Sequence, residues 1–383
     1  MFLALRDLRF ATGRFALMGS VVALISLLLV MLSGLTAGLG GQNTAAIDRL
    51  GEQGVQRLVF GGAADQEPTA SFTQSEFTVA QRDAWAATDG VASVEPLGVS
   101  QGRAIGLEHP VDTDPQGRAD VSGEPTTGVA TTAFIGLTPD GSDAPAGVEP
   151  GEIVLSQDVA DSLHAQAGDA VAVSGFVYTV ADVVPTEHYS HSPVTWLALE
   201  DWNAISHTAE DAVLGTAGLV RFDAGADADA VATAGDDAAG TVAETVKGSY
   251  AALPSYRSEN GSLMTMQGFL YGISALVVIA FLSIWTVQRT RDIAVLKALG
   301  GSNGWVLKDS LAQAAFVLVG GVAVGTGLAA VIGAFAGRAV PFELSWATTA
   351  VPAAGVLVLG MLAAVVAVYR VTRIDPLVAL GGN

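Results

Sequence analysis

Four long apolar runs predict four membrane-spanning helices. The runs lie at about Phe15–Leu39, Ser262–Val287, Leu311–Ala336 and Leu344–Tyr369, and none contains Asp, Glu, Lys or Arg. A helix rises about 1.5 Å per residue, so each run is long enough to cross a hydrocarbon core of about 30 Å. A polar segment at residues 40–261 separates the first run from the other three and is long enough to form an independent domain.

The distribution of charge predicts the orientation in the membrane. Residues 1–14, 288–310 and 370–383 carry nine basic and four acidic residues, whereas residues 40–261 carry eight basic and 33 acidic residues. Short loops rich in Lys and Arg stay in the cytoplasm. We therefore expect both termini and the loop after the second helix inside the cell, with the acidic domain outside. Such an acidic domain repels nucleic acid.

The first apolar run has two interpretations, because a basic start followed by an apolar stretch also describes a secretory signal. This run is longer than the apolar region of a signal, and three later spans require a paired topology. We interpret it as a retained anchor. The chain has no cysteine, so the outer domain needs an ordinary hydrophobic core, and disulfides and thiolate metal sites are excluded.

The pattern in residues 40–261 mixes strands and helices, which predicts an α+β domain inserted between membrane helices one and two. Strands are expected at Val55–Phe60, Val91–Glu95, Val99–Leu107, Thr131–Leu137, Glu152–Leu155, Ala170–Ser174, Phe176–Val184 and Pro193–Leu199. Thr78 is expected to open a helix to Ala87, and Ser156 a helix to about Ala167. The stretch Ala224–Ala239 is either a flexible surface segment or a poorly specified helix.

Two histidines, His188 and His191, lie within the five residues Glu187–His191. Histidines at this spacing can share a metal ion. They can equally belong to a surface loop that follows the end of a strand at Val183-Val184-Pro185, and we prefer this second interpretation. Since no Ser/His/Asp arrangement stands out, we predict no catalytic residue and no intrinsic metal site.

A short amphipathic helix is predicted directly after the second membrane helix, in the loop at residues 288–310. Ile293, Leu296 and Leu299/Gly300 fall on one helical face, with Arg289, Asp292 and Lys297 elsewhere, and Gly300-Gly301 ends the helix. A basic anchor alone would need no apolar face. Such a helix can lie at the membrane surface or dock into a groove on a partner protein, and we expect docking.

Four segments in matching order resemble the FtsX/MacB-type permeases. They are the amphipathic N-terminal segment Leu3–Arg9, the outer-domain pattern Gly151–Val184, the Arg-Thr-Arg-Asp-Ile opening of Arg289–Ser302, and the Ile-Asp-Pro-Leu-Val-Ala-Leu ending within Val371–Leu380. The arrangement of one helix, a large outer domain and three further helices matches as well. The resemblance therefore covers nearly the whole chain.

This resemblance implies a permease subunit of a type VII ABC transporter in the cell membrane of a bacterium. It implies a homodimer that pairs with two copies of a separate cytoplasmic ATPase, to which ATP and Mg²⁺ bind. The chain has no Gly-x-x-x-x-Gly-Lys-Ser/Thr phosphate loop, so we expect it to be non-catalytic. By resemblance, coupling to the ATPase is assigned to Arg289, Arg291, Ile293, Leu296, Lys297, Leu299 and Gly300, with Arg6–Phe10 and Arg373–Leu380 packed nearby.

Two pairs of glycines on the third membrane helix, Gly321/Gly325 and Gly333/Gly337, predict close helix packing. The contact lies either within one chain or at a dimer seam, and we prefer the first. The spans carry no charge, so nothing in them predicts a proton or ion path. A lipophilic cargo taken sideways from the bilayer fits these spans better than a hydrophilic solute.

Methionine and aromatic residues gather around the predicted outer ends of helices one and two. A thioether or a phenolate can ligate haem iron, and aromatic rings can flank a porphyrin. The alternative is that these residues fill packing gaps and mark the membrane interface. The candidate haem contacts are Met31, then Met264, Met266 and Glu259, with Tyr256, Tyr271 and Phe269 nearby.

A narrower resemblance favours haem among the possible cargoes. The segments Met1–Phe10 through Leu32–Leu39, and Tyr189–Trp196, resemble the HrtB-type haem-exporter permeases of actinobacteria. This resemblance implies that the cargo is haem, taken from the outer leaflet. Two other functions stay open: export of peptides or lipoproteins, as in the MacB and Lol relatives, and FtsX-like regulation of a cell-wall hydrolase.

Overall fold

The computed structural model describes residues 12–62, 67–139, 141, 143–206, 212–288 and 303–372. The chain divides into two compact units. The helical unit comprises Met1–Leu39 and Asn260–Asn383, and the sheet unit comprises Gly40–Glu259.

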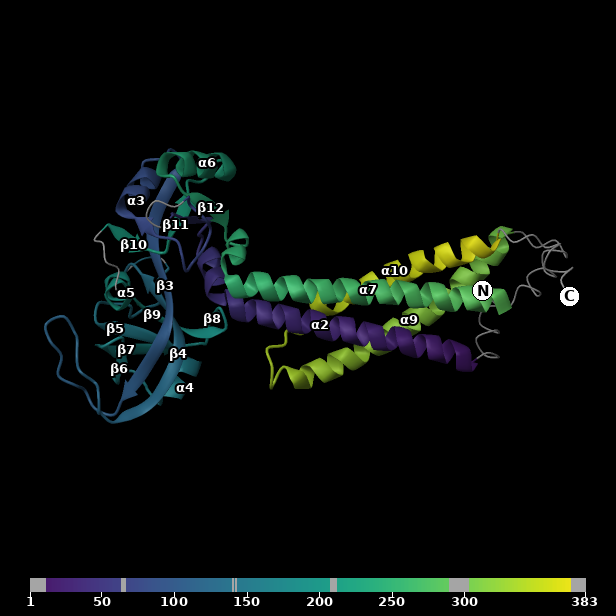
Figure 1. Cartoon of the computed structure of the whole chain (residues 1–383), viewed down its shortest axis with the longest axis horizontal. Helices are drawn as coiled ribbons and strands as arrows, with labels where there is room; N and C mark the ends of the chain where they lie inside the picture. Colours follow the sequence, from purple (N-terminus) through teal and green to yellow (C-terminus); the bar gives the residue numbers. More distant parts are fainter. Residues whose placement is uncertain are drawn as a thin grey trace, which may run out of the picture. The chain divides into compact units, whose positions relative to one another are not determined.

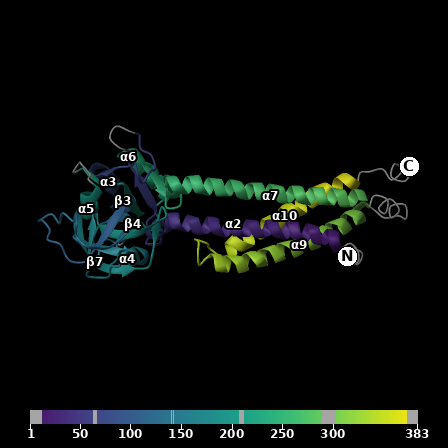
Figure 2. The same ribbon diagram turned by 60° about the horizontal axis from the view of Figure 1, so that its bottom comes forward.

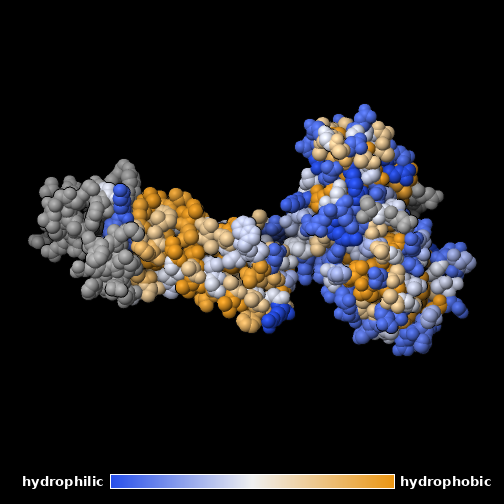
Figure 3. All heavy atoms as spheres, turned by 180° about the vertical axis from the view of Figure 1, so that it is seen from behind, coloured by the Kyte–Doolittle hydropathy of each residue, from blue (hydrophilic) through white to orange (hydrophobic). Residues whose placement is uncertain are grey.

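Four long helices account for the described part of the helical unit: α2 (Thr12–Glu52), α7 (Pro254–Gln288), α9 (Asn303–Ala336) and α10 (Trp346–Thr372). All four are long and apolar enough to cross a membrane, so the four predicted helices are confirmed. They run alongside one another in two views (Figures 1 and 2), and their outer surface is predominantly hydrophobic (Figure 3). Exposed apolar side chains are what lipid contact requires.

Two helices extend well beyond the apolar runs. Helix α2 continues past Leu39 to Glu52, and α7 begins at Pro254, eight residues before Ser262. Hydropathy detects only the charge-free part of a helix, whereas the extensions are amphipathic. In the extension of α2, Ala46, Ile47 and Leu50 are buried in the core of the sheet unit. Pro254 suits a first helical position because its missing N–H has no partner there.

The glycines of α9 pack within the chain. A Cβ atom at Gly321 would lie 2.9 Å from the carbonyl oxygen of Gly19 and from Val22, and a Cβ at Gly325 would overlap the Ala23 carbonyl. Helices α2 and α9 therefore approach each other at backbone distance. Of the two interpretations of Gly321/Gly325, packing within one chain is the one the structure shows.

The sheet unit is built on a ten-stranded sheet. Its strands are β1 (Arg57–Phe60), β3 (Val91–Leu107), β4 (Thr126–Leu137), β5 (Glu152–Ser156), β6 (Ala170–Val173), β7 (Phe176–Val184), β8 (His188–Tyr189), β9 (Ser192–Ala198), β11 (Ala217–Phe222) and β12 (Val242–Thr245). Strands β2 (Phe77–Thr78) and β10 (Val213–Gly215) form a separate pair. The helices are α3 (Val79–Ala86), α4 (Gln157–Leu163), α5 (Leu199–Ser206), α6 (Ala228–Ala239) and a 3-10 helix at Gly248–Ala252.

Strand β3 belongs to two lobes of this unit. Its first part, to Leu97, pairs with β11, and its second part, from Gly98, pairs with β4 (Figure 1). The second part also pairs with β6, which closes the ring β3–β4–β9–β5–β7–β6 around a core that includes Phe134, Leu155 and Trp202. In the other lobe, α3 and α6 pack on the order β12–β1–β11–β3 through Trp85 and Phe222.

Two local predictions for this unit were wrong in detail, and Ser156 precedes α4 as predicted without a side-chain cap. The strands predicted at Val91–Glu95 and Val99–Leu107 are one continuous strand. Helix α4 ends at Leu163 instead of near Ala167, because His164 adopts a left-handed conformation. The hydroxyl of Ser156 does not cap α4 but donates to the carbonyl of Val194 at 2.6 Å.

The predicted Thr78 cap is confirmed, and the Ala224–Ala239 stretch is resolved as a helix. Thr78 and Gln81 form a capping box at the start of α3. Helix α6 begins after Asp227, whose carboxylate accepts from two backbone N–H groups, and ends at Gly240 in the left-handed conformation. An N-cap carboxylate and a C-terminal glycine together specify a helix whose interior is weakly patterned.

We expect Thr78→Ala to lower the free energy of unfolding by about 1 kcal/mol, because the cap of α3 is lost. The Thr78 hydroxyl accepts from the Gln81 N–H at 3.3 Å, and Gln81 accepts from the Thr78 N–H at 3.0 Å. Urea unfolding of the whole chain in detergent can be followed through tryptophan fluorescence, to which Trp85, buried on the same helix, contributes. Thr78→Ser keeps the hydroxyl and is the matched control; equal stability of Thr78→Ala and the unmodified chain would contradict the assignment.

Candidate functional site

An apolar cavity of about 560 Å³ lies within the helical unit. It is bordered by α2, by α7 and by the end of α9 with the connection to α10. The lining residues are Leu28, Met31, Leu32, Leu35, Met266, Phe269, Leu270, Ala336, Val340 and Phe342. All of them are apolar, and the volume lies in the range of sites for small organic ligands. The cavity therefore suits a lipophilic ligand.

The cavity brings together Met31 and Met266, two of the sequence-predicted haem contacts, with Phe269 beside them. Met31 is half-buried, whereas Met266 and Phe269 are 55% and 69% exposed. The cavity is thus open along α7, where these two side chains are exposed. Two thioethers and an aromatic ring line one apolar space, a combination that can contact a planar apolar ring system.

The other predicted contacts are not part of this lining. Met264 is 62% exposed and does not line the cavity. Tyr271 packs on α10, where a Cβ at Gly355 would lie 2.8 Å from its ring. Tyr256 and Glu259 belong to the sheet unit, where Tyr256 makes an edge contact with Tyr250. Val340 and Phe342 were missed by sequence reasoning, because they lie in a connection after α9 and not on a predicted helix.

A second site, which is polar, lies in the sheet unit at the tight turn between β8 and β9. Ser190 and His191 are the two residues of this turn, and both have positive φ, 48° and 65°. This is the backbone of a type I′ turn, which normally selects Asn and Gly. Non-glycine residues in the left-handed region persist where surrounding contacts hold them.

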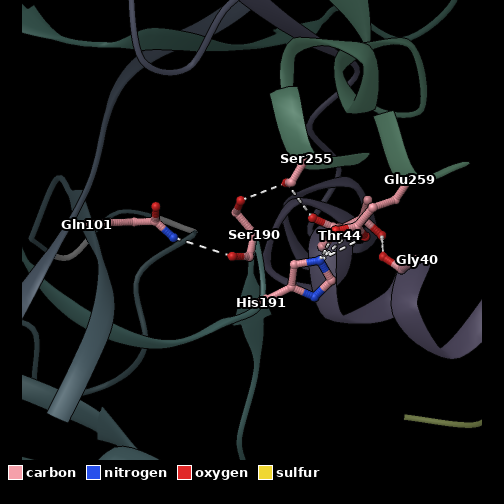
Figure 4. Close-up of polar contacts among 8 residues, drawn as sticks. Gly40, Thr44, Gln101, Ser190, His191, Ser255 and Glu259 are labelled. Carbon is pink, nitrogen blue, oxygen red and sulfur yellow. Dashed lines mark hydrogen bonds and ion pairs between the residues drawn. The ribbon is translucent and has the colours of Figure 1, made fainter. Parts of the chain in front are cut away.

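Those contacts come from α2 and α7, as Figure 4 shows. The Ser190 and His191 N–H groups donate to the Asn43 and Gln42 carbonyls at 3.1 and 2.9 Å. The Nε2 atom of His191 lies 2.9 Å from an oxygen of Glu259 and 3.0 Å from the amide nitrogen of Asn43.

Hydroxyl groups complete this cluster, which we call the turn cluster (Asn43, Ser190, His191, Ser255 and Glu259). The Ser255 hydroxyl donates to the side-chain oxygen of Asn43 at 2.7 Å and lies 2.9 Å from the Ser190 hydroxyl. The amide of Asn43 also donates to Glu259 at 3.2 Å. The side chain of Glu259 is thus engaged in the sheet unit, and the arrangement ties one hairpin to two helices.

Neighbouring charges anchor the same hairpin to α2. Arg49 on α2 lies 3.4 Å from Glu187 and stacks on Trp196 of β9 at 4.6 Å. Burial raises the pKa of Glu187 more than the Arg49 guanidinium lowers it. Burial also lowers the pKa of His188, against the attraction of Asp158 at 3.9 Å. Among the described residues, no group of three or more His, Asp or Glu side chains could hold a metal ion. His188 lies on β8, and His191 lies in the turn to β9.

The predicted ATPase-coupling residues, Arg289–Gly300, lie outside the residues that the structure describes, as do Arg6–Phe10 and Arg373–Leu380. Their assignment stays a prediction.

Residues 264–376 match the family described as FtsX-like permease C-terminal. The chain therefore carries an FtsX-like permease domain, and this part of the sequence resemblance is confirmed. The match covers α7 from Met264 onward, α9 and α10, together with residues 289–302 and 373–376, which lie outside the described residues.

The chain is similar to a putative hemin transport system permease protein HrtB of Staphylococcus haemolyticus, with 29% identity over 130 residues. The alignment covers 34% of this chain and 37% of the relative's length. Two solved structures each cover 50% of this chain. The extracellular domain of the noncanonic ABC-type transporter YknZ from Gram-positive bacteria has 12% identity and a TM-score of 0.32. The periplasmic region of MacB from Actinobacillus actinomycetemcomitans has 10% identity and a TM-score of 0.34.

We expect Asn43→Ala to destabilise the sheet unit by about 1–3 kcal/mol, because it leaves Ser255 and Glu259 without their amide partner. Asn43 is 1% exposed, so water does not replace these bonds. Thermal unfolding of the whole chain in detergent measures the effect. Gln42→Ala is the matched control, since it keeps the backbone carbonyl that binds the turn; similar losses in both variants would contradict the role of the Asn43 side chain.

Proposed function

We propose that this chain, with its FtsX-like permease domain at residues 264–376, is the membrane subunit of an ABC transporter that exports a lipophilic cargo. The domain match and the apolar cavity beside it carry the proposal together. The chain contains no phosphate loop of its own, so ATP and Mg²⁺ would bind to a separate cytoplasmic ATPase present in two copies.

The proposed cargo is haem. The cavity offers Met31 and Met266 as thioether contacts and Phe269 as an aromatic neighbour, without a charged residue in its lining. The similarity to a putative hemin transport permease over 130 residues supports the same cargo. Glu259, Tyr256 and Tyr271 are not needed for this site, since none of them lines the cavity.

The open side of the cavity supports a homodimer as the transporting form. Met266 and Phe269 at this side are more than half exposed, and Met264, Ile273 and Leu276 continue the exposed apolar face of α7. A second copy laid on this face would cover the cavity, and lipid would cover it in a single chain. Both termini would lie in the cytoplasm, as the basic segments require.

Haemin added to the purified chain in detergent is expected to give a Soret band that Met31→Ala shifts or abolishes, because a thioether contact to the iron is lost. Met266→Ala is expected to act in the same direction, since Met266 lines the same cavity.

Met264→Ala is the matched control for this experiment. It removes a methionine from the same helix, two residues away, without touching the cavity lining. A spectrum that is unchanged in both Met31→Ala and Met266→Ala would refute the site. Haemin binding that depends on Met264 alone would place the binding site on the exposed face of α7.

Leu296→Glu is expected to uncouple ATP hydrolysis from transport in the complex with the ATPase, because it places a charge on the predicted apolar face of Arg289–Gly300. Transport into vesicles and ATP hydrolysis are measured side by side. Ala298→Glu puts the same charge about 200° around a helix and is the control. Normal transport by Leu296→Glu would reject the docking assignment.

A further inference from the structure

The connection between α9 and α10 packs into a notch made of three glycines. A Cβ atom at Gly34 would overlap the ring of Phe342, and one at Gly333 would lie 2.5 Å from the same ring. A Cβ at Gly38 would overlap the carbonyl of Pro341. Glycine at these three positions is what allows the connection to reach the surfaces of α2 and α9. We call Gly34, Gly38 and Gly333 the glycine cradle.

Hydrogen bonds fix the backbone directly after Phe342. The N–H of Glu343 donates to the carbonyl of Gly34 at 3.0 Å. The hydroxyl of Thr348, a buried residue in the first turn of α10, donates to the carbonyl of Glu343 at 3.0 Å. The Ser345 hydroxyl accepts from the Thr348 N–H at 3.2 Å and caps the helix. The backbone beside Phe342 is therefore tied to α2 on one side and to α10 on the other.

The glycine cradle adjoins the cavity on one face of α2. Met31, Gly34, Leu35 and Gly38 follow the i, i+3, i+4, i+7 spacing that places residues on one side of a helix. Met31 and Leu35 line the cavity, while Gly34 and Gly38 hold the connection. The half-buried ring of Phe342 does both, since it rests on Gly34 and Gly333 and also lines the cavity.

We propose that Phe342, seated in the glycine cradle, is a specificity-determining residue that sets the size of the ligand the cavity admits. The inference rests on the proposed function, since it assigns a role within the same cavity. The ring is the one aromatic wall that the α9–α10 connection contributes to the lining. The distance that the Phe342 ring extends into the cavity depends on the absence of side chains at Gly34 and Gly333. A methyl group at either position therefore pushes the ring toward the ligand.

The test measures binding of two probes to the full chain in nanodiscs: haemin, and the smaller neutral dye N-phenyl-1-naphthylamine. Gly34→Ala is expected to weaken haemin binding on the order of tenfold, because the displaced ring takes up cavity space, with a change under about threefold for the smaller dye. Gly333→Ala approaches the same ring from α9 and is expected to act alike. Phe342→Ala is expected to weaken the dye about fivefold, since a wall contact is lost, and to leave haemin within about threefold.

The decisive variant is Gly34→Ala combined with Phe342→Ala, which is expected to restore haemin binding to within about threefold of the unmodified chain. Gly41→Ala on α2 and Gly327→Ala on α9 are the matched controls, because no heavy atom lies within 4 Å of a Cβ at either position. Both controls are expected to bind both probes unchanged.

Failure of the inference and failure of the proposed cargo give different results. Haemin binding that survives in Gly34→Ala and Gly333→Ala, or that Phe342→Ala does not rescue, overturns the role of Phe342 and leaves the proposed function in place. Binding of neither probe to the unmodified chain above empty nanodiscs overturns both. A general folding defect of Gly34→Ala predicts no rescue by a second substitution, so rescue itself supports the specific contact.

Discussion

The close approach of α2 and α9 is the contact on which the rest of the helical unit depends. Lipid removes the hydrophobic drive that brings helices together in water, so packing has to come from backbones that approach each other through small residues. Gly321 and Gly325 provide this approach against Val22 and Ala23. Further along the same two helices, Gly34 and Gly333 hold Phe342. One pair of helices thus provides both the closest packing and the support for one wall of the cavity.

Sequence patterns predicted the elements that the bilayer or local chemistry constrains strongly. Charge-free runs revealed the four helices because lipid excludes charge. Thr78 was recognised because capping is a local interaction. The extensions of α2 and α7 were missed because they belong almost entirely to the sheet unit and carry polar residues, so hydropathy gives no signal there. Strand β3 was predicted as two strands, although it continues through Pro96 and changes partner at Gly98.

The candidate site was predicted only as far as it lies on helices. Met31 and Met266 were found because their positions on two predicted spans implied similar depth, and the cavity contains both. Phe342 could not be found in this way, since its role depends on tertiary contacts with Gly34 and Gly333, which the order of residues does not pair. The spacing of the two histidines allowed a metal site or a surface loop, and the loop was preferred. His191 lies in the turn between β8 and β9 and contacts Glu259.

At the Ser190-His191 turn, the energetic cost of a left-handed backbone is opposed by the free energy gained from hydrogen bonds. Left-handed backbone at a non-glycine residue costs about 1–3 kcal/mol. The backbone hydrogen bonds of the turn to Asn43 and Gln42 do not need the two side chains, whereas the contacts with Ser255 and Glu259 do. Glycine at either position would relax the backbone and remove one of those side chains at once. The identity of these two residues is therefore determined by the contacts that their side chains make with α2 and α7. The conformational preference of the turn does not determine it. Backbone geometry alone would favour Asn and Gly at this turn instead of Ser and His.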